Sequence, residues 1–391
     1  MPQAEWAAPE PAAQAHSERL IEFIRAEIDA AGGAIPFERY MDLALYAPGL
    51  GYYAAGARKF GEQGDFVTAP EVSPLFARCL ARQCAEVFAE MGGADILELG
   101  AGSGAMAADI LIELAAIESL PRHYFILEVS PDLRDRQATR LRATLPAGVF
   151  ERVRWLDVPP GQFRGVVLAN EVLDALPVAR FRVDESGFHE EMVSWNGARF
   201  ESRWRPASEP LRERLQQVLA ELPPLALPYV SEICPRLPAF VKLLAESLEQ
   251  GAMLFIDYGY PRREYYLPER SMGTLMCHYR HRAHDDPFAL PGLQDITAFV
   301  DFTTVAEAGT EAGLELQGFT TQAQFLLGAG LTDILPRIDP GDTLRSLKIS
   351  QEVQKLTLPG EMGDRFRVMG LSRALDTALS GFSLRDYSST L

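Results

Sequence analysis

The sequence is poor in cysteine, has no long apolar run and lacks a block of basic residues. Four cysteines without a Cys-x-x-Cys pair are too few for a disulfide framework, so we expect them as buried thiols. No apolar stretch approaches the roughly 18 residues of a membrane span. The first 30 residues are rich in glutamate and have no apolar segment. This composition argues against a secretory or mitochondrial leader and predicts a cytoplasmic protein.

The charged residues are mostly acidic: 37 Lys and Arg against 54 Asp and Glu give a net charge of −17 at pH 7. Such a chain repels phosphate backbones, so a nucleic-acid partner is disfavoured and a basic protein partner is expected. With 47% hydrophobic and 23% charged residues, the composition is that of a globular protein and excludes a wholly disordered chain. At about 150 residues per domain, the 391 residues correspond to two or three domains.

Strands alternate with helices from Asp95 onwards. This alternation predicts an α/β fold with a mostly parallel, doubly wound sheet and helices on both of its faces. The strands expected in this sheet are 96–100, 124–128, 153–157, 166–170, 252–257 and 366–371. Before the sheet we expect a helix that starts at Ser17, as its N-cap, and stops at Gly32-Gly33.

The alternation breaks between residues 178 and 250, where short strands surround the turns at 185–187 and 196–197. We therefore expect an inserted α+β subdomain, which would hold either the substrate or a second subunit. The domains expected are an N-terminal helical cap with substrate-side loops (1–90), the first half of the core (91–177), the insertion (178–250), and the second half of the core with C-terminal elements (251–391).

A glycine loop, Gly100-Ala101-Gly102-Ser103-Gly104, joins the first core strand to the first core helix. Glycines there let the backbone turn tightly and approach a ligand. The pattern also satisfies a dinucleotide fingerprint, but its Gly-x-Gly-x-Gly form is that of Rossmann-like methyltransferases that use S-adenosylmethionine (SAM). Glu98, just before the loop, would repel a pyrophosphate and suits a cationic methionine group.

Two further acids follow the next core strands. Glu128, 28 residues after Gly100, is placed for a ribose clamp, which fits SAM and a dinucleotide equally. Asp157 ends the third strand and would accept a hydrogen bond from an adenine amino group; a turn former before Pro159-Pro160 is the alternative. Together they indicate a nucleoside-type ligand.

Asn170, Glu171 and Asp174 follow the fourth strand, at the edge where open α/β sheets bind ligands. We interpret Asn170 and Glu171 as site residues, with capping of the next helix as the alternative. Tyr258, after the fifth strand, would line a substrate channel or form a turn.

Three strings of the sequence resemble the MidA-type methyltransferase family, that of the mitochondrial complex I assembly factor: 64–73 (GDFVTAPEVS), 98–104 (ELGAGSG) and 170–178 (NEVLDALPV). The segments 257–260, 292–302 and 318–325 strengthen the match, which extends over roughly residues 35–375. The resemblance implies a class I SAM-dependent methyltransferase fold. It also implies a protein-arginine methyltransferase acting on a respiratory complex I subunit.

By this resemblance the loop Gly100–Gly104 lines the cofactor site, Glu128 holds the ribose, and Asn170 and Glu171 lie beside the sulfonium. A guanidinium, with a pKa above about 12, is best oriented by carboxylates. Our catalytic candidates are therefore Asn170, Glu171, Asp174 and Glu71. For Glu71 an acid in the first turn of a helix is the alternative.

Two other functions stay open. An NAD(P)-dependent oxidoreductase would use the same loop, but we find no Tyr, Lys or His constellation for it. A non-catalytic assembly factor that binds SAM is the second. A homodimer also stays open. We expect no metal, because His278, His281 and His284 read as a loop without a shared face.

Overall fold

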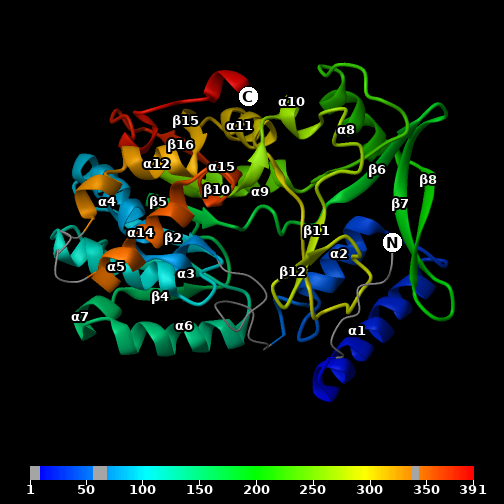
Figure 1. Ribbon diagram of the computed structural model, residues 1–391, viewed down its shortest axis with the longest axis horizontal. Coiled ribbons are helices and arrows are strands. Elements are labelled where there is room, and N and C mark those ends of the chain that lie inside the picture. Colours follow the sequence, from blue (N-terminus) through cyan, green and yellow to red (C-terminus); the bar gives the residue numbers. More distant parts are fainter. Residues whose placement is uncertain (1–8, 56–67, 336–342) are drawn as a thin grey trace.

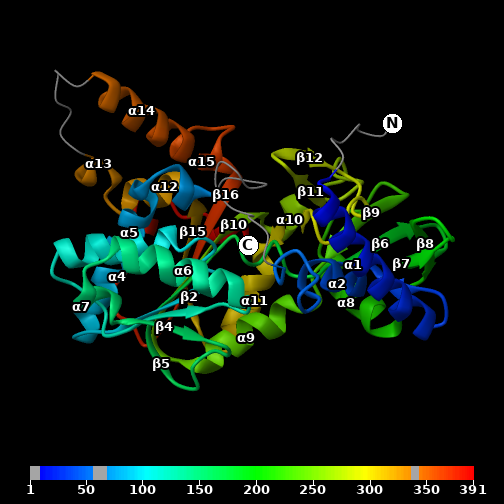
Figure 2. The same cartoon turned by 90° about the horizontal axis from the view of Figure 1, so that it is seen from below.

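The computed structural model describes residues 9–55, 68–335 and 343–391. Residues 64–67 of the first family string therefore lie outside the described residues. Figure 1 shows two parts of the molecule. The left part contains a large sheet and the helices that cover it, and the right part contains a smaller antiparallel sheet with α1 and α2. Figure 2, seen from below, keeps this arrangement: α4 and α7 lie at one end, and α1, β7 and β8 at the other.

The large sheet has the strand order β15-β16-β10-β5-β2-β3-β4, with β14 added at β10. Its strands are β2 (Asp95–Leu99), β3 (Tyr124–Leu127), β4 (Val153–Leu156), β5 (Phe163–Asn170), β10 (Leu248–Tyr260), β14 (Val300–Asp301), β15 (Glu315–Thr321) and β16 (Phe366–Arg373). Neighbours from β4 to β10 are parallel, whereas β16 is antiparallel to β10 and β15. The predicted mostly parallel α/β core, a Rossmann-like class I fold, is confirmed.

Side chains of the central strands alternate between two cores. Ile96 and Val166 point into a core built with α4 and α5, whereas their neighbours Leu97 and Val167 point into a core built with α9 and α11. Because both faces are covered, the strands are continuously apolar rather than alternating with polar residues. The helices of these layers are α4 (Pro74–Met91), α5 (Ala105–Ala116), α6 (Pro131–Thr144), α9 (Leu237–Ser247) and α11 (Phe302–Glu311).

A second body forms from three distant parts of the chain. Its five-stranded antiparallel sheet contains β1 (Ile35–Pro36), β6 (Ala179–Asp184), β7 (Gly187–Trp195), β8 (Phe200–Pro206) and β9 (Tyr229–Ile233). Helices α1 (Pro11–Ala30), α2 (Phe37–Tyr46) and α8 (Glu209–Leu219) pack against it. A small sheet, β11 (Met276–Tyr279), β12 (Arg282–His284) and β13 (Asp295–Thr297), shares its core with α1 and α2.

This grouping cuts across the order of the chain. Within the predicted cap 1–90, α4 packs in the large-sheet core, while α1 and α2 pack in the second body. The small sheet belongs to 251–391 in sequence but packs with α1 and α2. Hydrophobic contact, rather than chain order, therefore decides which segments form one body.

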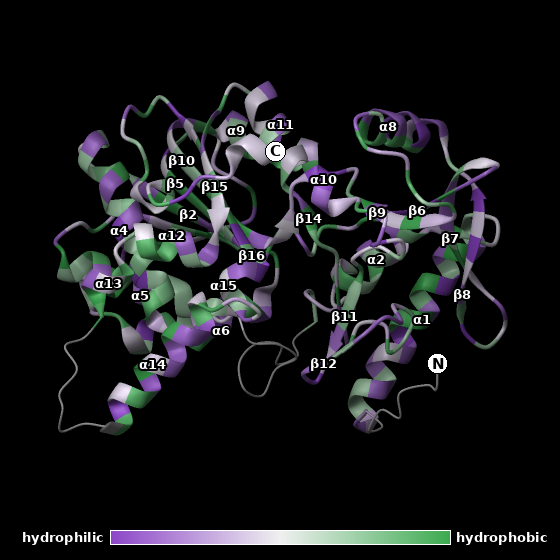
Figure 3. Cartoon of the chain, turned by 45° about the horizontal axis from the view of Figure 1, so that its top comes forward, coloured by the Kyte–Doolittle hydropathy of each residue, from purple (hydrophilic) through white to green (hydrophobic). Residues whose placement is uncertain are grey.

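One boundary prediction is wrong. Helix α1 begins at Pro11 rather than after Ser17, and the Ser17 hydroxyl donates a hydrogen bond to the Pro291 carbonyl, 2.8 Å away. Ser17 is thus a tertiary contact within the helix, and the proline at its first position starts the helix instead. Figure 3 shows α1 with both hydrophilic and hydrophobic turns, as expected for a helix that buries one face. Its end before Gly32-Gly33 is confirmed.

Other elements were not expected from the sequence. Strands β9 and β15 and the small sheet β11–β13 are short or carry polar residues, so their pairing partners decide their conformation. The remaining helices are α3 (Ala69–Val72), α7 (Ala147–Phe150), α10 (Arg262–Tyr265), α12 (Gln322–Gly328), α13 (Leu331–Ile334), α14 (Thr343–Thr357), α15 (Met362–Arg365) and the two 3-10 turns Ser380–Phe382 and Ser388–Thr390. None of the helices in the described ranges has the length and apolarity needed to cross a membrane.

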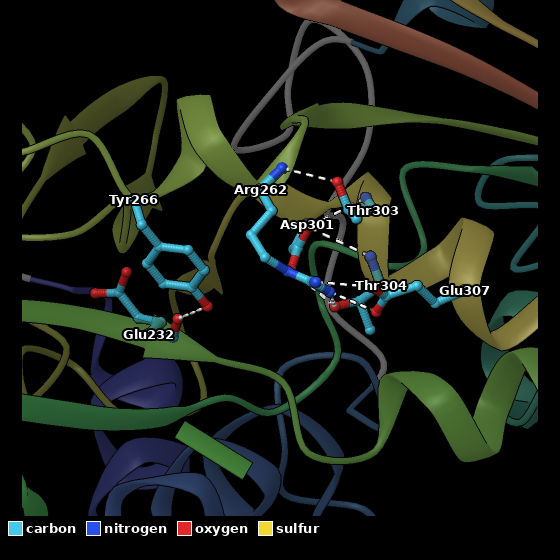
Figure 4. Close-up of polar contacts among 7 residues, drawn as sticks. All are labelled: Glu232, Arg262, Tyr266, Asp301, Thr303, Thr304 and Glu307. Carbon is cyan, nitrogen blue, oxygen red and sulfur yellow. Dashed lines mark hydrogen bonds and ion pairs between the residues drawn. The ribbon is translucent and has the colours of Figure 1, made fainter. Parts of the chain in front are cut away.

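A partly buried ion-pair cluster fixes the segment after β10 to α11, as Figure 4 shows. The Arg262 guanidinium contacts Glu307 at 2.7 Å and Asp301 at 3.3 Å, and the Arg262 backbone N–H donates to Thr303 at 2.9 Å. Asp301 also caps α11 by accepting from the backbone of Thr303 and Thr304. The cluster thus anchors the segment that links the central sheet to the second body.

Candidate active site

A cavity of about 330 Å³ opens at the carboxyl ends of β2, β3, β5 and β10. The second body closes one side of it with Tyr46 and Tyr53, which lie at and after the end of α2, and with His278, Asp295 and Thr297 from the small sheet. This is the sheet edge at which the sequence places a ligand. The cavity therefore has a central-sheet side and a second-body side.

The glycine loop forms the floor of the central-sheet side. Gly100, Gly102 and Gly104 have φ values of +60°, +53° and +80°, in the left-handed region that side chains rarely adopt. Gly100, Ala101 and Gly102 line the cavity, whereas Gly104 lies outside its lining and precedes the first turn of α5. The loop thus needs glycine for its conformation as well as for access.

Glu128 is held against this loop by a residue that sequence reasoning missed. Its carboxylate accepts from the Ser130 backbone at 2.9 Å and from the Gln137 amide at 3.1 Å. The same Gln137 amide donates to the Gly102 carbonyl at 3.0 Å, and the Trp155 indole fixes its other end at 2.9 Å. No local signal marks Gln137, because only the packing of α6 brings it between Glu128 and the loop.

Glu98 lies beneath the loop and is almost fully buried. The Tyr124 hydroxyl donates to its carboxyl group at 2.9 Å. Burial raises the pKa of Glu98 to about 8, so the group is largely protonated at neutral pH. In this structure Glu98 is therefore largely a neutral hydrogen-bonding group rather than the anion expected from the sequence.

Replacing Glu98 with glutamine should make stability less dependent on pH. In the folded protein the pKa lies above its ordinary value, so wild-type stability falls as pH rises from about 4.5 to 8. Glutamine does not ionise. Over this pH range the free energy of unfolding of Glu98→Gln should therefore fall by up to about 1.4 kcal/mol less per pH unit than that of the wild type. Chemical unfolding of both proteins at pH 5 and pH 8 measures this, and parallel curves would contradict it.

Three of the predicted site residues lie at the end of β5 and in the loop after it. Asn170 is the last residue of β5, Glu171 and Asp174 belong to the loop, and all three line the cavity. Glu171 has a left-handed backbone, with φ +53°, which is strained for a residue with a side chain. Asp257, at the end of β10, holds the loop by accepting from the backbone of 172–174 at 2.9–3.2 Å. Asp257 is thus a positioning residue that sequence reasoning did not single out for this purpose.

These carboxyl groups favour one another's protonated forms. Burial, and then the charge of Asp257, raise the pKa of Glu171 to about 8. Burial and the charges of Asp257 and Glu171 raise the pKa of Asp174 as well. A cation entering the cavity would relieve this repulsion and favour the ionised carboxylates.

Two predicted residues lie differently from expectation. Glu71, in α3, lines the cavity, but its carboxylate accepts hydrogen bonds from Ser103 of the glycine loop and from Arg140 at 3.3 Å. The contact ties α3 to the cofactor side. Asp157 lies outside the cavity lining, with a largely exposed side chain paired to Arg134 at 2.8 Å. An adenine contact for Asp157 therefore stays a prediction.

The histidines singled out in the sequence lie on the paired strands β11 and β12 and the turn between them. His278 lies in β11, opposite Asp295, and lines the cavity, whereas His284 lies in β12. In the ranges that the structure describes, no three His, Cys, Asp or Glu side chains are grouped to hold a metal ion. Tyr258 also lines the cavity.

Comparison with known proteins identifies the family of this fold. Residues 79–320 match the model of a family described as S-adenosyl-L-methionine-dependent methyltransferases. The chain belongs to this family. A protein of Drosophila melanogaster named "Protein arginine methyltransferase NDUFAF7 homolog, mitochondrial" is 30% identical to it over 93% of this chain and 87% of its own length. The human protein arginine methyltransferase NDUFAF7 is 27% identical over 87% of this chain and 80% of its own length.

A crystal structure of a Burkholderia thailandensis protein bound to S-adenosyl-homocysteine is also similar. It is 48% identical, has a TM-score of 0.93 and covers 99% of this chain and 100% of its own. The chain is thus a methyltransferase of the MidA-type family, and SAM is its cofactor. These relatives do not favour the NAD(P)-dependent oxidoreductase that the glycine loop alone left open.

The cavity fits SAM on observations of its own. The left-handed glycine loop leaves room for a ligand beside the start of α5, and Glu128 offers carboxylate oxygens to ribose hydroxyls. The buried Asn170 Oδ1 has no hydrogen-bond partner within the described residues. An acceptor of this kind at the end of β5 suits the ammonium group of the methionine part.

Proposed function

We propose that this methyltransferase modifies an arginine side chain of a protein substrate. Six carboxyl side chains line the cavity, and its described lining contains no lysine or arginine. They are Glu71, Glu98, Glu128, Glu171, Asp174 and Asp295. This acidic lining carries the proposal, because an arginine guanidinium stays charged at any physiological pH. The names of the curated relatives support it.

The residues after β5 would perform three tasks. SAM, when bound, supplies an electrophilic methyl group. Glu171 and Asp174 orient the planar guanidinium through paired hydrogen bonds, so that one nitrogen faces that methyl group. As carboxylates they also localise the positive charge away from the attacking nitrogen and accept a proton when it is released. Asp257 keeps both on a fixed loop.

The acidic surface suits a basic protein segment as partner. By the family resemblance, we propose a respiratory complex I subunit as the substrate. The second body closes one side of the cavity, and this supports a role for it in binding the substrate.

Product analysis tests the proposal. Purified enzyme is incubated with methyl-labelled SAM and a protein extract of cells from which its gene is deleted. The labelled protein is then hydrolysed to amino acids. We expect the label in methylarginine. Label in another amino acid would overturn the arginine assignment, and bound SAM without any labelled protein would favour a non-catalytic assembly factor.

A further inference from the structure

Asp295, on the second-body side of the cavity, is a buried carboxylate in the segment 292–302 of the family resemblance, and it was not among the predicted site residues. It begins β13, lines the cavity and is 2% exposed. The Tyr53 hydroxyl donates to both of its oxygens at 2.9 Å, and the Ile296 backbone N–H donates to Oδ1 at 2.9 Å. These bonds fix the orientation of the Asp295 carboxylate at the cavity wall.

The chain after α2 is shaped to bring Tyr53 to this place. The backbone N–H groups of Tyr52 and Tyr53 donate to the Ala44 and Leu45 carbonyls of α2 at 2.9 and 2.8 Å. At Gly51 a Cβ would lie only 2.5 Å from backbone atoms of the preceding residues, so the turn requires glycine. The position of Tyr53 is therefore built into the fold.

Asp295 also lies close to the proposed substrate carboxylates. The segment after β13 is bonded to their loop, because the Ala298 N–H donates to the Asp174 carbonyl at 3.0 Å. The charge of Asp295 contributes to the raised pKa of both Glu171 and Asp174. Carboxyl groups from both sides of the cavity thus share one electrostatic environment.

Two aromatic rings complete this environment. Tyr46 and Tyr53 both line the cavity and stack on each other, with centroids 5.6 Å apart and an angle of 22° between the rings. The Tyr46 hydroxyl donates to the Ala175 carbonyl at 3.0 Å, which fixes the ring next to the loop after β5. Aromatic faces beside carboxylates match a guanidinium, a flat cation that stacks and donates in its own plane.

We propose that Asp295 binds the substrate guanidinium from the second-body side of the cavity, whereas Glu171 and Asp174 bind it from the central-sheet side. Tyr53 orients the Asp295 carboxylate for this contact. The inference rests on the proposed arginine substrate and adds a specificity-determining residue to it. The cofactor groups come from the central sheet, so Asp295 acts on the substrate and not on SAM.

The test compares Asp295→Asn, Tyr53→Phe and the double variant with wild type. Methyl transfer from labelled SAM is measured against a dilution series of the extract lacking the gene, and SAM affinity is measured by calorimetry. Asp295→Asn should raise the half-saturating extract concentration at least about tenfold, as for loss of a charge-assisted hydrogen bond, with SAM affinity unchanged. Tyr53→Phe should raise it less, and the double variant no more than Asp295→Asn, since the two residues act as a unit.

Asp184→Asn, in the β6–β7 hairpin outside the cavity, is the matched control and should behave as wild type. Methylarginine formed by Asp295→Asn and Tyr53→Phe at unchanged half-saturation would overturn the inference and leave the proposed function standing. Weakened SAM binding in Asp295→Asn, together with an unchanged half-saturating extract concentration in Tyr53→Phe, would assign Asp295 a structural role. That result would also overturn the inference. Absence of methylarginine with wild-type enzyme would instead refute the proposed function itself.

Discussion

Glu171→Gln is expected to lower the rate of methyl transfer by about 10²–10⁴-fold while leaving SAM affinity within about twofold. Glutamine keeps the size of the side chain and its bond to Asn170, but it cannot become an anion beside the guanidinium. SAM binding depends mainly on the glycine loop and Glu128, which the change does not touch. Single-turnover rates and calorimetry on the same preparation measure the two quantities.

The pH dependence of kcat/KM tests the role of Glu171 in a second way. Because the pKa of Glu171 is raised to about 8, the carboxylate becomes fully populated only above that pH. Wild-type kcat/KM should therefore rise from about pH 6 through about pH 8 and level only above it, and Glu171→Gln should lack that rise. Glu151→Gln, on the exposed surface after α7, is the control. Wild-type turnover in Glu171→Gln would remove the residue from the mechanism.

Glu128→Ala is expected to weaken SAM binding at least tenfold, or about 1.4 kcal/mol. Hydrogen bonds from ribose hydroxyls to a carboxylate are charge-assisted, and their loss alone accounts for that amount. The substitution also releases Gln137, which then holds the Gly102 carbonyl without its second partner. Calorimetric titration with SAM measures the affinity, and titration with NADH provides a check on cofactor choice.

Glu151→Ala removes the same side chain from a surface position of the same core and should leave SAM affinity as in wild type. Equal SAM affinity in Glu128→Ala and wild type would show that the ribose is held elsewhere. Binding of NADH with no response to SAM would contradict the cofactor. Circular dichroism of both variants verifies that a change in affinity is not a change in folding.

The central sheet was predictable because its signals are local. Each parallel strand is a short apolar run, and each is followed by a turn or a helix start that the sequence marks, such as Ser130 capping α6. Strands β9, β15 and β11–β13 escaped prediction because they carry polar residues and are completed by pairing partners elsewhere in the chain. The start of α1 was misplaced because a serine used for a tertiary contact resembles a cap.

The sequence by itself determined the side of the site that holds the glycine loop and Glu128. Its residues follow parallel strands, and the carboxyl ends of parallel strands meet at one edge of the sheet. Only the tertiary structure decided the second-body side of the cavity: Tyr53 and Asp295 are 242 residues apart and meet through packing of the second body. It also decided protonation, since burial, which no motif displays, raises the pKa of Glu98 and Glu171 to about 8.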